Sequence, residues 1–248
     1  MQIAFLTTDD PLYLPLLFDR VLDAHGNSSA VFVVPPLYKE QTTLEAALRY
    51  YRSFGAAATW QLAVRTIGAK LQRQSIARVC AHHGVPCESV SDVNDESFLA
   101  RLQTLGTELI VSVSCPQIFK TPLIELPPKG CLNVHGAILP AYRGVLPSFW
   151  MLANGETHAG VSVFFVNDDI DAGELCGQRR FAIHPDETLD GFLRRSKCVA
   201  AELLLDVLRQ VQDKQVVRTP IDLTQGSYYS WPSRDAVRRF REAGRRLW

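Results

Sequence analysis

Short apolar runs alternate with amphipathic segments along the first half of the chain. Ile3 to Thr7, Ala30 to Val34 and Leu109 to Ser114 are runs typical of buried strands. The segments between them carry apolar residues at helical spacing, and strands that are buried on both faces are expected in parallel sheets. The pattern therefore predicts an α/β fold, with a mostly parallel twisted sheet and helices on both faces.

The predicted helices have recognisable ends. Thr7–Pro11 supplies capping side chains and a proline for the start of a helix that ends at Gly26. Asn94 is expected to cap a helix that runs to about Leu105. The longest helix is expected over Leu189–Gln212, after two extended segments in the second half of the chain.

The segment from Tyr38 to Gln74 interrupts the alternation. Its apolar and aromatic residues recur at roughly helical spacing, which predicts a 38–74 insert of one or two helices. Aromatic stripes belong to a core more often than to a binding site, so we favour extra packing as the role of this insert. The alternative is a lid or flap over a functional site.

The regular pattern of strands and helices ends after the longest predicted helix. We therefore divide the chain into a main domain, 1–212, and a short C-terminal extension, 213–248. The extension holds an irregular aromatic segment, Ser227–Pro232, and then a short basic helix from Ser233 to Arg246. We expect this helix to be solvated, because acidic residues temper its charge. The alternative is that the basic helix binds a phosphorylated ligand or a nucleic acid backbone. The aromatic rings of the preceding segment either stack on a ligand or cover a sheet edge.

Composition excludes some classes of function. The 248 residues hold 26 basic and 26 acidic side chains, so the formal net charge is zero and we do not expect nucleic acid as a partner. The N-terminus has no basic region before its first apolar run, and no apolar segment reaches membrane-spanning length. We therefore expect a cytoplasmic protein without membrane contact.

The six cysteines do not form a CxxC pair, so reduced, buried thiols are expected. The segment Cys80–Cys87 also contains His82 and His83 and resembles a metal cluster. Zinc ligands usually lie on tight, matched turns, whereas this segment runs from a helix end into a strand. We predict a helix C-cap and no metal site.

The chemistry is concentrated in Asn133–Gly144, which begins as a strand and opens into a loop with proline and glycine. Side chains two apart share a face of a strand, so Asn133 and His135 point the same way. A carboxamide donor beside an imidazole suits a carbonyl whose oxygen gains negative charge, as in acyl transfer. Asp171, in a later turn before Gly173, is a candidate charge partner. Taken singly, each of these residues has a structural interpretation as a turn, edge or core residue.

The combination resembles the folate-dependent formyltransferase family. The resemblance is strong from about Leu109 to Leu208 and rests on strand order alone before that. It implies a Rossmann-like formyltransferase fold and a catalytic domain over 1–212. The matching positions are Asn133, His135, Ile138, Leu139, Pro140, Tyr142, Arg143 and Gly144, then Asn154–Thr157, Gly160–Val163 and Asp171–Leu175.

The resemblance implies a formyl donor, 10-formyltetrahydrofolate, and an amine acceptor. Asn133 would donate a hydrogen bond to the formyl oxygen as charge develops there. Protonated His135 would add a charged donor, and Asp171 would favour that protonated form and help to move a proton from the amine to the leaving nitrogen. Which of these two residues relays the proton stays open.

The resemblance also implies binding residues of lower specificity. Two loops would offer main-chain groups to the folate: Cys115, Pro116, Gln117, Ile118 and Phe119, and then Val166, Asn167, Asp168, Asp169 and Ile170. Arg143 would orient a phosphate or the folate, unless the Tyr-Arg-Gly segment is a structural turn. The remaining candidates for acceptor contact are Tyr142, Thr8 and Asp9.

Departures from the family pattern reduce the number of acceptors that we expect. Ala137 stands where serine is common, which removes one hydroxyl hydrogen bond and is expected to alter local packing or acceptor contact. The turn after the first strand contains no glycine, which disfavours glycinamide ribonucleotide as acceptor. The segment after Gln212 is short for the β-barrel domain of methionyl-tRNA formyltransferases, which disfavours the tRNA acceptor.

We therefore predict an N-formyltransferase that acts on the primary amine of a small molecule, with a nucleotide-linked amino sugar as the leading acceptor. An amino acid or siderophore-precursor amine is close behind. The alternatives are a 10-formyltetrahydrofolate hydrolase, a methionyl-tRNA formyltransferase-like enzyme and a degenerate homologue that binds folate or a partner. A nicotinamide dehydrogenase is disfavoured because no GxGxxG follows the first strand. The oligomeric state stays open, with a homodimer as one expectation.

Overall fold

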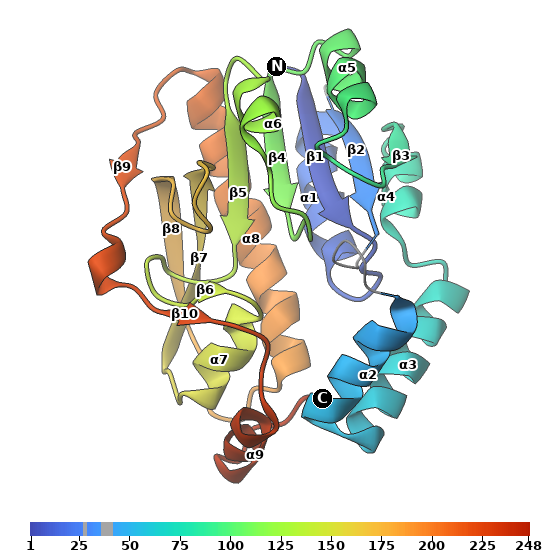
Figure 1. The fold of residues 1–248 in the computed structure, drawn as a ribbon, viewed down its shortest axis with the longest axis vertical. Coiled ribbons are helices and arrows are strands. Elements are labelled where there is room, and N and C mark those ends of the chain that lie inside the picture. Colours follow the sequence, from blue (N-terminus) through green and yellow to red (C-terminus); the bar gives the residue numbers. More distant parts are fainter. Residues whose placement is uncertain (27–28, 36–41) are drawn as a thin grey trace.

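The computed structural model describes residues 1–26, 29–35 and 42–248, and its centre is an eight-stranded sheet (Figure 1). The strands form because apolar, β-branched and aromatic residues recur in short runs. In spatial order they are β3 (Cys87–Ser89), β2 (Ser29–Val34), β1 (Ile3–Thr8), β4 (Leu109–Val113), β5 (Cys131–His135), β7 (His158–Phe165), β8 (Glu174–Ala182) and β9 (Thr219–Pro220).

The sheet is mostly parallel, as predicted. The five strands from β3 to β5 in this order pair in parallel, whereas the pairs β5–β7, β7–β8 and β8–β9 are antiparallel. The antiparallel part arises because β7 and β8 are joined by the short loop 166–173 and not by a crossover helix. The chain extends from β1 to one side and later returns to β4 on the other, which leaves a switch point between these strands at their carboxyl ends.

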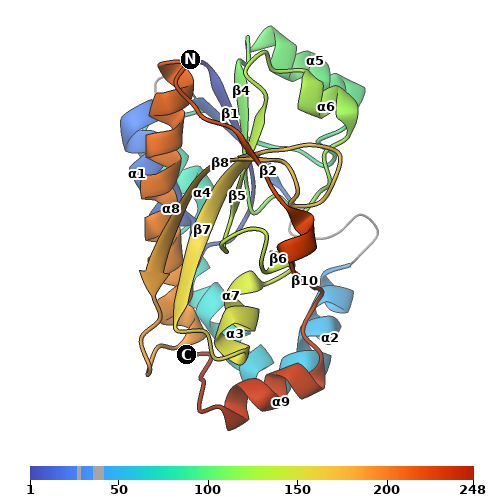
Figure 2. The same cartoon turned by 90° about the vertical axis from the view of Figure 1, so that its left-hand side faces the viewer.

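Helices cover both faces of the sheet, which confirms the predicted α/β architecture (Figure 2). One face packs against α1 (Leu14–His25), α4 (Ile76–His82) and α8 (Leu189–Gln212). The other packs against α5 (Glu96–Thr104) and α6 (Thr121–Glu125). The observed bounds of α8 equal the predicted ones. In the described part of the chain, no helix is long and apolar enough to cross a membrane.

Two predicted helix starts are wrong. The first helix begins at Leu14, because Asp10 first accepts hydrogen bonds from the N–H groups of Leu12 and Tyr13 and forms a separate turn. Asp95, not Asn94, caps α5 through the N–H of Ser97. The Asn94 carboxamide is held elsewhere, since it donates to the carbonyl of Ile118 and accepts from the N–H of Lys120.

The predicted insert contains two helices, α2 (Thr43–Phe54) and α3 (Ala56–Leu71). Residues 38–41 of the predicted range lie outside the described residues. Thr42 and Glu45 form a reciprocal capping box at the start of α2, and Gly55 turns the chain into α3 with a φ of 86°. Phe54 and Ala58 anchor the pair in a third apolar cluster, so the insert does contribute packing.

The C-terminal extension packs against the rest of the fold. It contains β9, a 3₁₀ turn (Leu223–Gln225), β10 (Tyr228–Tyr229) and α9 (Arg234–Glu242). The predicted irregular aromatic segment in fact includes β10, which pairs in parallel with the short strand β6 (Arg143–Gly144). Helix α9 packs beside α2 and beside α7 (Pro147–Ala153).

The expectation that the basic helix is simply solvated needs correction. Arg241 donates to the carbonyl of Phe54, and Arg245 donates to the carbonyls of His184 and Pro185. These arginines bind main-chain oxygens of other elements and so fix the extension in place. The division at residue 212 stays a prediction.

Replacing Phe240 by alanine tests whether the extension is part of the cooperative core. Phe240 is fully buried and stacks on Phe149 of α7, with 5.1 Å between ring centroids. Loss of such a ring leaves a cavity and costs about 3–5 kcal/mol. Urea unfolding should show this loss in the free energy of unfolding. The exposed neighbour Arg239, changed to alanine, should lose under about 1 kcal/mol; equal losses in both variants would contradict the packing.

Candidate active site

The site begins at the carboxyl end of β5, where Asn133 and His135 project from the same face of the strand. Asn133 is half-buried, and His135 is only 7% exposed. Asn133 has no side-chain hydrogen bond to any residue in the described ranges, so its carboxamide is available to a ligand. Strand alternation thus places an unpaired amide and a buried imidazole side by side.

The imidazole of His135 lies between a carbonyl and a carboxylate. Its Nε2 is 2.9 Å from the carbonyl oxygen of Tyr142, and its Nδ1 is 3.7 Å from Oδ1 of Asp171. A carbonyl oxygen only accepts, so we assign the Nε2 proton to this hydrogen bond. Nδ1 is therefore the nitrogen that gains or loses a proton, and it faces Asp171.

Asp171 is positioned by the motif loop that follows β5. Its Oδ2 accepts a hydrogen bond of 2.9 Å from the N–H of Gly144, and its own φ of 51° is left-handed. Arg143 donates from Nε and Nη2 to the carbonyl of Ile170, at 3.2 and 3.0 Å. A side chain at Gly173 would overlap the carbonyl oxygen of Phe165, so the hairpin loop can close only with glycine there.

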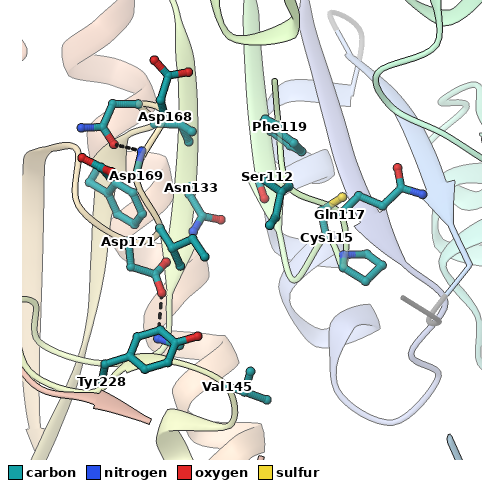
Figure 3. Close-up of a pocket in the computed structure, with 17 residues that line it drawn as sticks. Ser112, Cys115, Gln117, Phe119, Asn133, Val145, Asp168, Asp169, Asp171 and Tyr228 are labelled. Atoms are coloured by element: carbon teal, nitrogen blue, oxygen red, sulfur yellow. Dashed lines mark hydrogen bonds between the residues drawn. The ribbon is translucent and has the colours of Figure 1, made fainter. Parts of the chain in front are cut away.

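A cavity of about 390 Å³, here called cavity A, opens on one side of these residues (Figure 3). Cys115–Phe119 and Val166–Ile170 line it from opposite sides, and so all ten residues predicted to contact folate surround it. Asn133 and Asp171 point into it, and Tyr228 of the C-terminal extension closes one end. Its volume lies within the range of small-molecule sites.

The wall of cavity A that consists of Cys115–Phe119 is held in place by the side chain of Gln117, which faces away from the cavity. Gln117 accepts from the N–H of Val93 and donates to the carbonyl of Ser91, at 2.8 and 2.6 Å. This amide is therefore committed to holding the loop, which leaves ligand recognition to the main chain and to apolar contacts. Ile118, which is 67% exposed, forms an apolar lip.

A second cavity of about 530 Å³, cavity B, adjoins cavity A. Asn133 and Asp171 line both cavities, whereas His135 lines cavity B alone. Cavity B reaches the carboxyl ends of β1 and β4 and so occupies the switch point of the sheet. Its wall includes Arg49 of the insert and Trp231 of the extension.

Cavity B contains an ammonium group without a carboxylate partner. Lys197 of α8 donates to Oγ of Ser114 at 3.1 Å, and no described carboxylate lies within ion-pair distance of it. Burial lowers the pKa of Lys197, and the charge of Asp10 partly offsets this effect. Burial raises the pKa of Asp10, against the N–H of Leu12 and the charge of Lys197. Oγ1 of Thr8 is also buried without a hydrogen-bond partner among the described residues.

The lower-specificity predictions fall into two groups. Thr8 lines cavity B, whereas Asp9 is exposed outside both cavities. Arg143 is committed to the hairpin loop. The hydroxyl of Tyr142 donates to Glu156 at 2.6 Å, and its ring stacks on the extension; burial, followed by this bond, raises the pKa of Tyr142. The structure therefore gives Arg143 and Tyr142 structural contacts near the site.

Sequence reasoning did not identify Lys197, Ser114, Arg49 and Trp231 as a group. Lys197 and Ser114 are 83 residues apart, and a lysine in a long helix gives no local signal of the direction it faces. In the Cys80–Cys87 segment, His83 contacts Asp19 at 3.0 Å. Across the described ranges, no three His, Cys, Asp or Glu side chains are grouped so that they could hold a metal ion.

Comparison with known proteins identifies the relatives of this chain. The family model described as "Formyl transferase" matches residues 1–208. A curated relative, the methionyl-tRNA formyltransferase of Trichlorobacter lovleyi, is 32% identical over 161 residues, which are 65% of this chain and 51% of that protein. The chain thus spans about half the length of the curated relatives that it first matches.

Solved structures share the fold at lower identity. A sugar N-formyltransferase from Shewanella sp FDAARGOS_354 superposes with a TM-score of 0.59 at 18% identity, over 93% of this chain and 77% of that one. An N-formyltransferase from Helicobacter canadensis, in complex with folinic acid and dTDP-3-aminofucose, has a TM-score of 0.61 at 14% identity, over 93% and 71% of the two chains. The strand order, the extent of the match and the sequence identity together show that this chain belongs to the formyl transferase family.

Proposed function

We propose that this protein transfers a formyl group from 10-formyltetrahydrofolate to a primary amine of a small molecule, with a nucleotide-linked amino sugar as the leading acceptor. One observation carries the proposal: two adjoining cavities are both lined by Asn133 and Asp171. A group transfer needs two substrates whose reacting atoms meet at one point, whereas a binding protein needs only one cavity.

Cavity A fits the donor. It has the volume of a small-molecule site, apolar surfaces at Ile118, Phe119 and Ile170, and main-chain groups of two loops on opposite sides. A flat aromatic ring system with hydrogen-bonding groups along its edges fits a cavity of this kind. The donor supplies an activated formyl group on a tertiary nitrogen, and the relative from Helicobacter canadensis was solved with folinic acid. The two loops of cavity A would hold the folate, as the sequence predicts.

The three polar residues at the junction have distinct roles in this proposal. Asn133 donates a hydrogen bond to the formyl oxygen, because its carboxamide has no competing partner in the described chain. Protonated His135 adds a charged donor through Nδ1, because its Nε2 proton is bound to the Tyr142 carbonyl. Asp171 stabilises that charge through the Nδ1 contact of 3.7 Å. Negative charge on the formyl oxygen is thus stabilised more than the neutral carbonyl, which is the condition for catalysis.

Proton transfer follows from the fixed orientation of the imidazole. The Nε2 proton of His135 is bound to the Tyr142 carbonyl, so only Nδ1 exchanges a proton during turnover. The attacking amine loses a proton and the leaving nitrogen gains one, so the reaction consumes no net proton. His135 and Asp171 both lie where the amine enters, and the structure is compatible with a relay through either residue.

Cavity B fits an acceptor that carries negative charge. Lys197 and Arg49 bring two cations to its wall, and Ser114 adds a hydroxyl that can accept or donate. Trp231 also lines this cavity and offers an aromatic surface to a base or sugar. A phosphate-linked amino sugar combines these features, and the Helicobacter canadensis relative was solved with dTDP-3-aminofucose. We place the reaction in the cytoplasm, where unpaired cysteines such as the six found here are usual.

A methionyl-tRNA formyltransferase-like activity is the second candidate, because the curated relatives at about 30% identity carry that name. The two acceptors are distinguished by incubating the protein and 10-formyltetrahydrofolate with nucleotide-linked amino sugars, free amino sugars or charged tRNA. Mass spectrometry would then detect the gain of one formyl group. Formate release at the same rate without any acceptor would instead indicate hydrolysis.

Changing Asp171 to asparagine, or His135 to asparagine, should lower kcat/KM for formyl transfer by about 10³-fold or more, since each variant loses a charge or a proton carrier at the reacting atoms. The amide oxygen in D171N can still accept from the N–H of Gly144, so the loop stays in place. Tetrahydrofolate binding, measured by calorimetry, should change less than about threefold.

The matched control is His158, changed to asparagine. This exposed histidine begins β7 and lines neither cavity, so H158N should retain wild-type turnover. Turnover within tenfold of wild type in D171N and H135N would refute the proposed roles. Loss of folate binding in both would instead indicate a structural defect of the site.

Changing Lys197 to methionine tests the anionic acceptor. The variant removes the ammonium but keeps an unbranched side chain as far as Cε, so KM for the nucleotide-linked amino sugar should rise at least about tenfold. KM for the same sugar without its phosphates should change little, because that acceptor has no charge for Lys197 to bind. Equal effects on the two acceptors would contradict a phosphate contact.

The titration of Lys197 gives a prediction that does not require a known acceptor. Asp10 is the group that raises the lysine pKa against burial, so changing Asp10 to asparagine should lower the pKa of Lys197 further. The charged fraction of Lys197 would then be lost at a lower pH as the pH rises. NMR of lysine labelled with ¹³C at Cε measures this titration. Changing the exposed neighbour Asp9 to asparagine is the control and should leave the pKa unchanged.

A further inference from the structure

Asp190 lies in the first turn of α8 and accepts hydrogen bonds from three different helical elements. Its Oδ1 accepts from the hydroxyl of Tyr13 at 3.0 Å and from Nη2 of Arg65 at 2.6 Å. Its Oδ2 accepts from Nε of Arg194, one turn further along α8, at 3.2 Å. The side chain is only 16% exposed, so one largely buried carboxylate joins the start of α1, helix α3 of the insert and α8. These four residues are here called the Asp190 cluster.

The segment after α9 holds the main chain of α8 at the same place. The N–H groups of Leu189 and Asp190 donate to the carbonyls of Arg246 and Leu247, both at 2.9 Å. The start of a helix leaves such N–H groups without partners within the helix, and here another segment supplies the acceptors. The position of the Asp190 carboxylate is therefore fixed by its backbone as well as by its side chain.

Tyr13 connects the Asp190 cluster to cavity B, because it alone of the four residues lines that cavity. Leu189, Leu193 and Lys197 also line it, and they recur every four residues along one face of α8. This face is apolar beside Asp190 and cationic two turns later. Tyr13, whose hydroxyl is bound to Asp190, adds an aromatic ring to the apolar end of the cavity.

We propose that Asp190 is a positioning residue of the acceptor site: it holds Tyr13 as a wall that binds the acceptor, and Arg65 acts on acceptor affinity through the same carboxylate. This inference rests on the proposed function, which assigns cavity B to the acceptor. Helix α3 of the insert then influences binding through Arg65 although this residue does not line the cavity. Such a role differs from both extra packing and a lid.

The contacts of Tyr13 hold its ring in one orientation. The hydroxyl bond to Asp190 fixes one end of the side chain, and the guanidinium carbon of Arg194 lies 5.8 Å from the ring centroid. Arg194 does not line cavity B, so it supports the ring from outside the cavity. A ring fixed in this way offers a flat apolar surface to a sugar or a base, and the acceptor binds without the entropic cost of ordering that side chain.

The charges around Tyr13 keep its hydroxyl protonated and therefore able to donate. Burial raises the pKa of Tyr13, and the charge of Asp190 and the hydrogen bond to it raise the pKa further. The charge of Asp10 acts in the same direction, whereas the charge of Arg65 lowers the pKa. Two guanidinium groups, from Arg65 and Arg194, lie within hydrogen-bond distance of the Asp190 carboxylate and compensate its charge.

Kinetics with a thymidine-diphosphate-linked amino sugar as the probe acceptor test the effect on binding. Asp190→Asn should raise KM for this probe about tenfold but change kcat and KM for 10-formyltetrahydrofolate by less than about twofold, because Tyr13 lines cavity B and not cavity A. Tyr13→Phe keeps the ring but loses the bond to Asp190, so its KM for the probe should rise about threefold.

Glu202 provides the matched control. It also lies on α8 and accepts a hydrogen bond from an arginine, Arg179, at 3.0 Å, but it lines neither cavity. Glu202→Gln should therefore keep the wild-type KM for both substrates. Thermal unfolding of each variant shows whether a change in KM accompanies a loss of stability.

A double-mutant cycle tests whether Arg65 acts through Tyr13. Arg65→Met should raise KM for the probe about threefold in the wild-type background. The same change should have no further effect in Y13F, because the hydrogen bond through which Arg65 acts is already absent there. Additive effects on KM would contradict this route and indicate a general loss of packing.

The pKa of residue 13 provides a test that does not depend on turnover. With 3,5-difluorotyrosine in place of Tyr13, ¹⁹F NMR follows the titration, and the fluorines make the phenol more acidic. D190N should lower this pKa, because it removes a negative charge, whereas R65M should raise it, because it removes a positive charge. E202Q should leave it unchanged. Loosened packing would instead lower the pKa in both D190N and R65M, since burial is the largest cause of the shift.

An unchanged KM for the probe in D190N, or an unchanged pKa of residue 13 in that variant, would overturn the positioning role of Asp190. Failure of the proposed function would give a different result. A wild-type protein that formylates no nucleotide-linked amino sugar would refute the acceptor contact of Tyr13, whereas opposite pKa shifts in D190N and R65M would still support the hold of Asp190 on Tyr13.

Discussion

The carboxylate of Asp171 is the interaction on which the site depends. One of its oxygens accepts from the N–H of Gly144, and the other faces Nδ1 of His135. These contacts join the hairpin loop 166–173 to β5 and β6, so this side chain fixes the Val166–Ile170 wall of cavity A relative to His135. The clamp from Arg143 to the carbonyl of Ile170 acts between the same two segments. The Asp171 carboxylate therefore determines both the charge beside His135 and the position of the hairpin loop.

The C-terminal extension completes the same construction from a distant part of the sequence. Its strand β10 pairs with β6, which contains Arg143 and Gly144, and so it holds the segment that binds Asp171. Tyr228 closes cavity A, while Trp231 lines cavity B. Arg241 of α9 and Arg245 after it bind main-chain carbonyls and fix the end of the extension against the body of the fold. The extension is consequently a structural part of the two-cavity arrangement.

Local patterns predicted the sheet, its helices and the placement of Asn133 beside His135, because hydrophobic periodicity and strand alternation are properties of neighbouring residues. They could not distinguish Asn94 from Asp95 as a cap, since the choice depends on contacts of Asn94 with Ile118 and Lys120 far along the chain. They also could not show that Lys197 faces a cavity. That depends on how α8 is rotated against the sheet, which only tertiary packing decides.

The unpaired ammonium of Lys197 shows how the acceptor site can favour its ligand. A charged group taken out of water and given only a hydroxyl partner reduces the stability of the ligand-free protein. Asp10 offsets part of this cost but lies outside ion-pair distance, so the cation remains available. An anionic acceptor would complete the pair without displacing a competing carboxylate. The binding free energy of an anionic acceptor therefore includes a favourable contribution, because it compensates the desolvation of the Lys197 ammonium. A neutral amine does not pair with the ammonium and lacks this contribution.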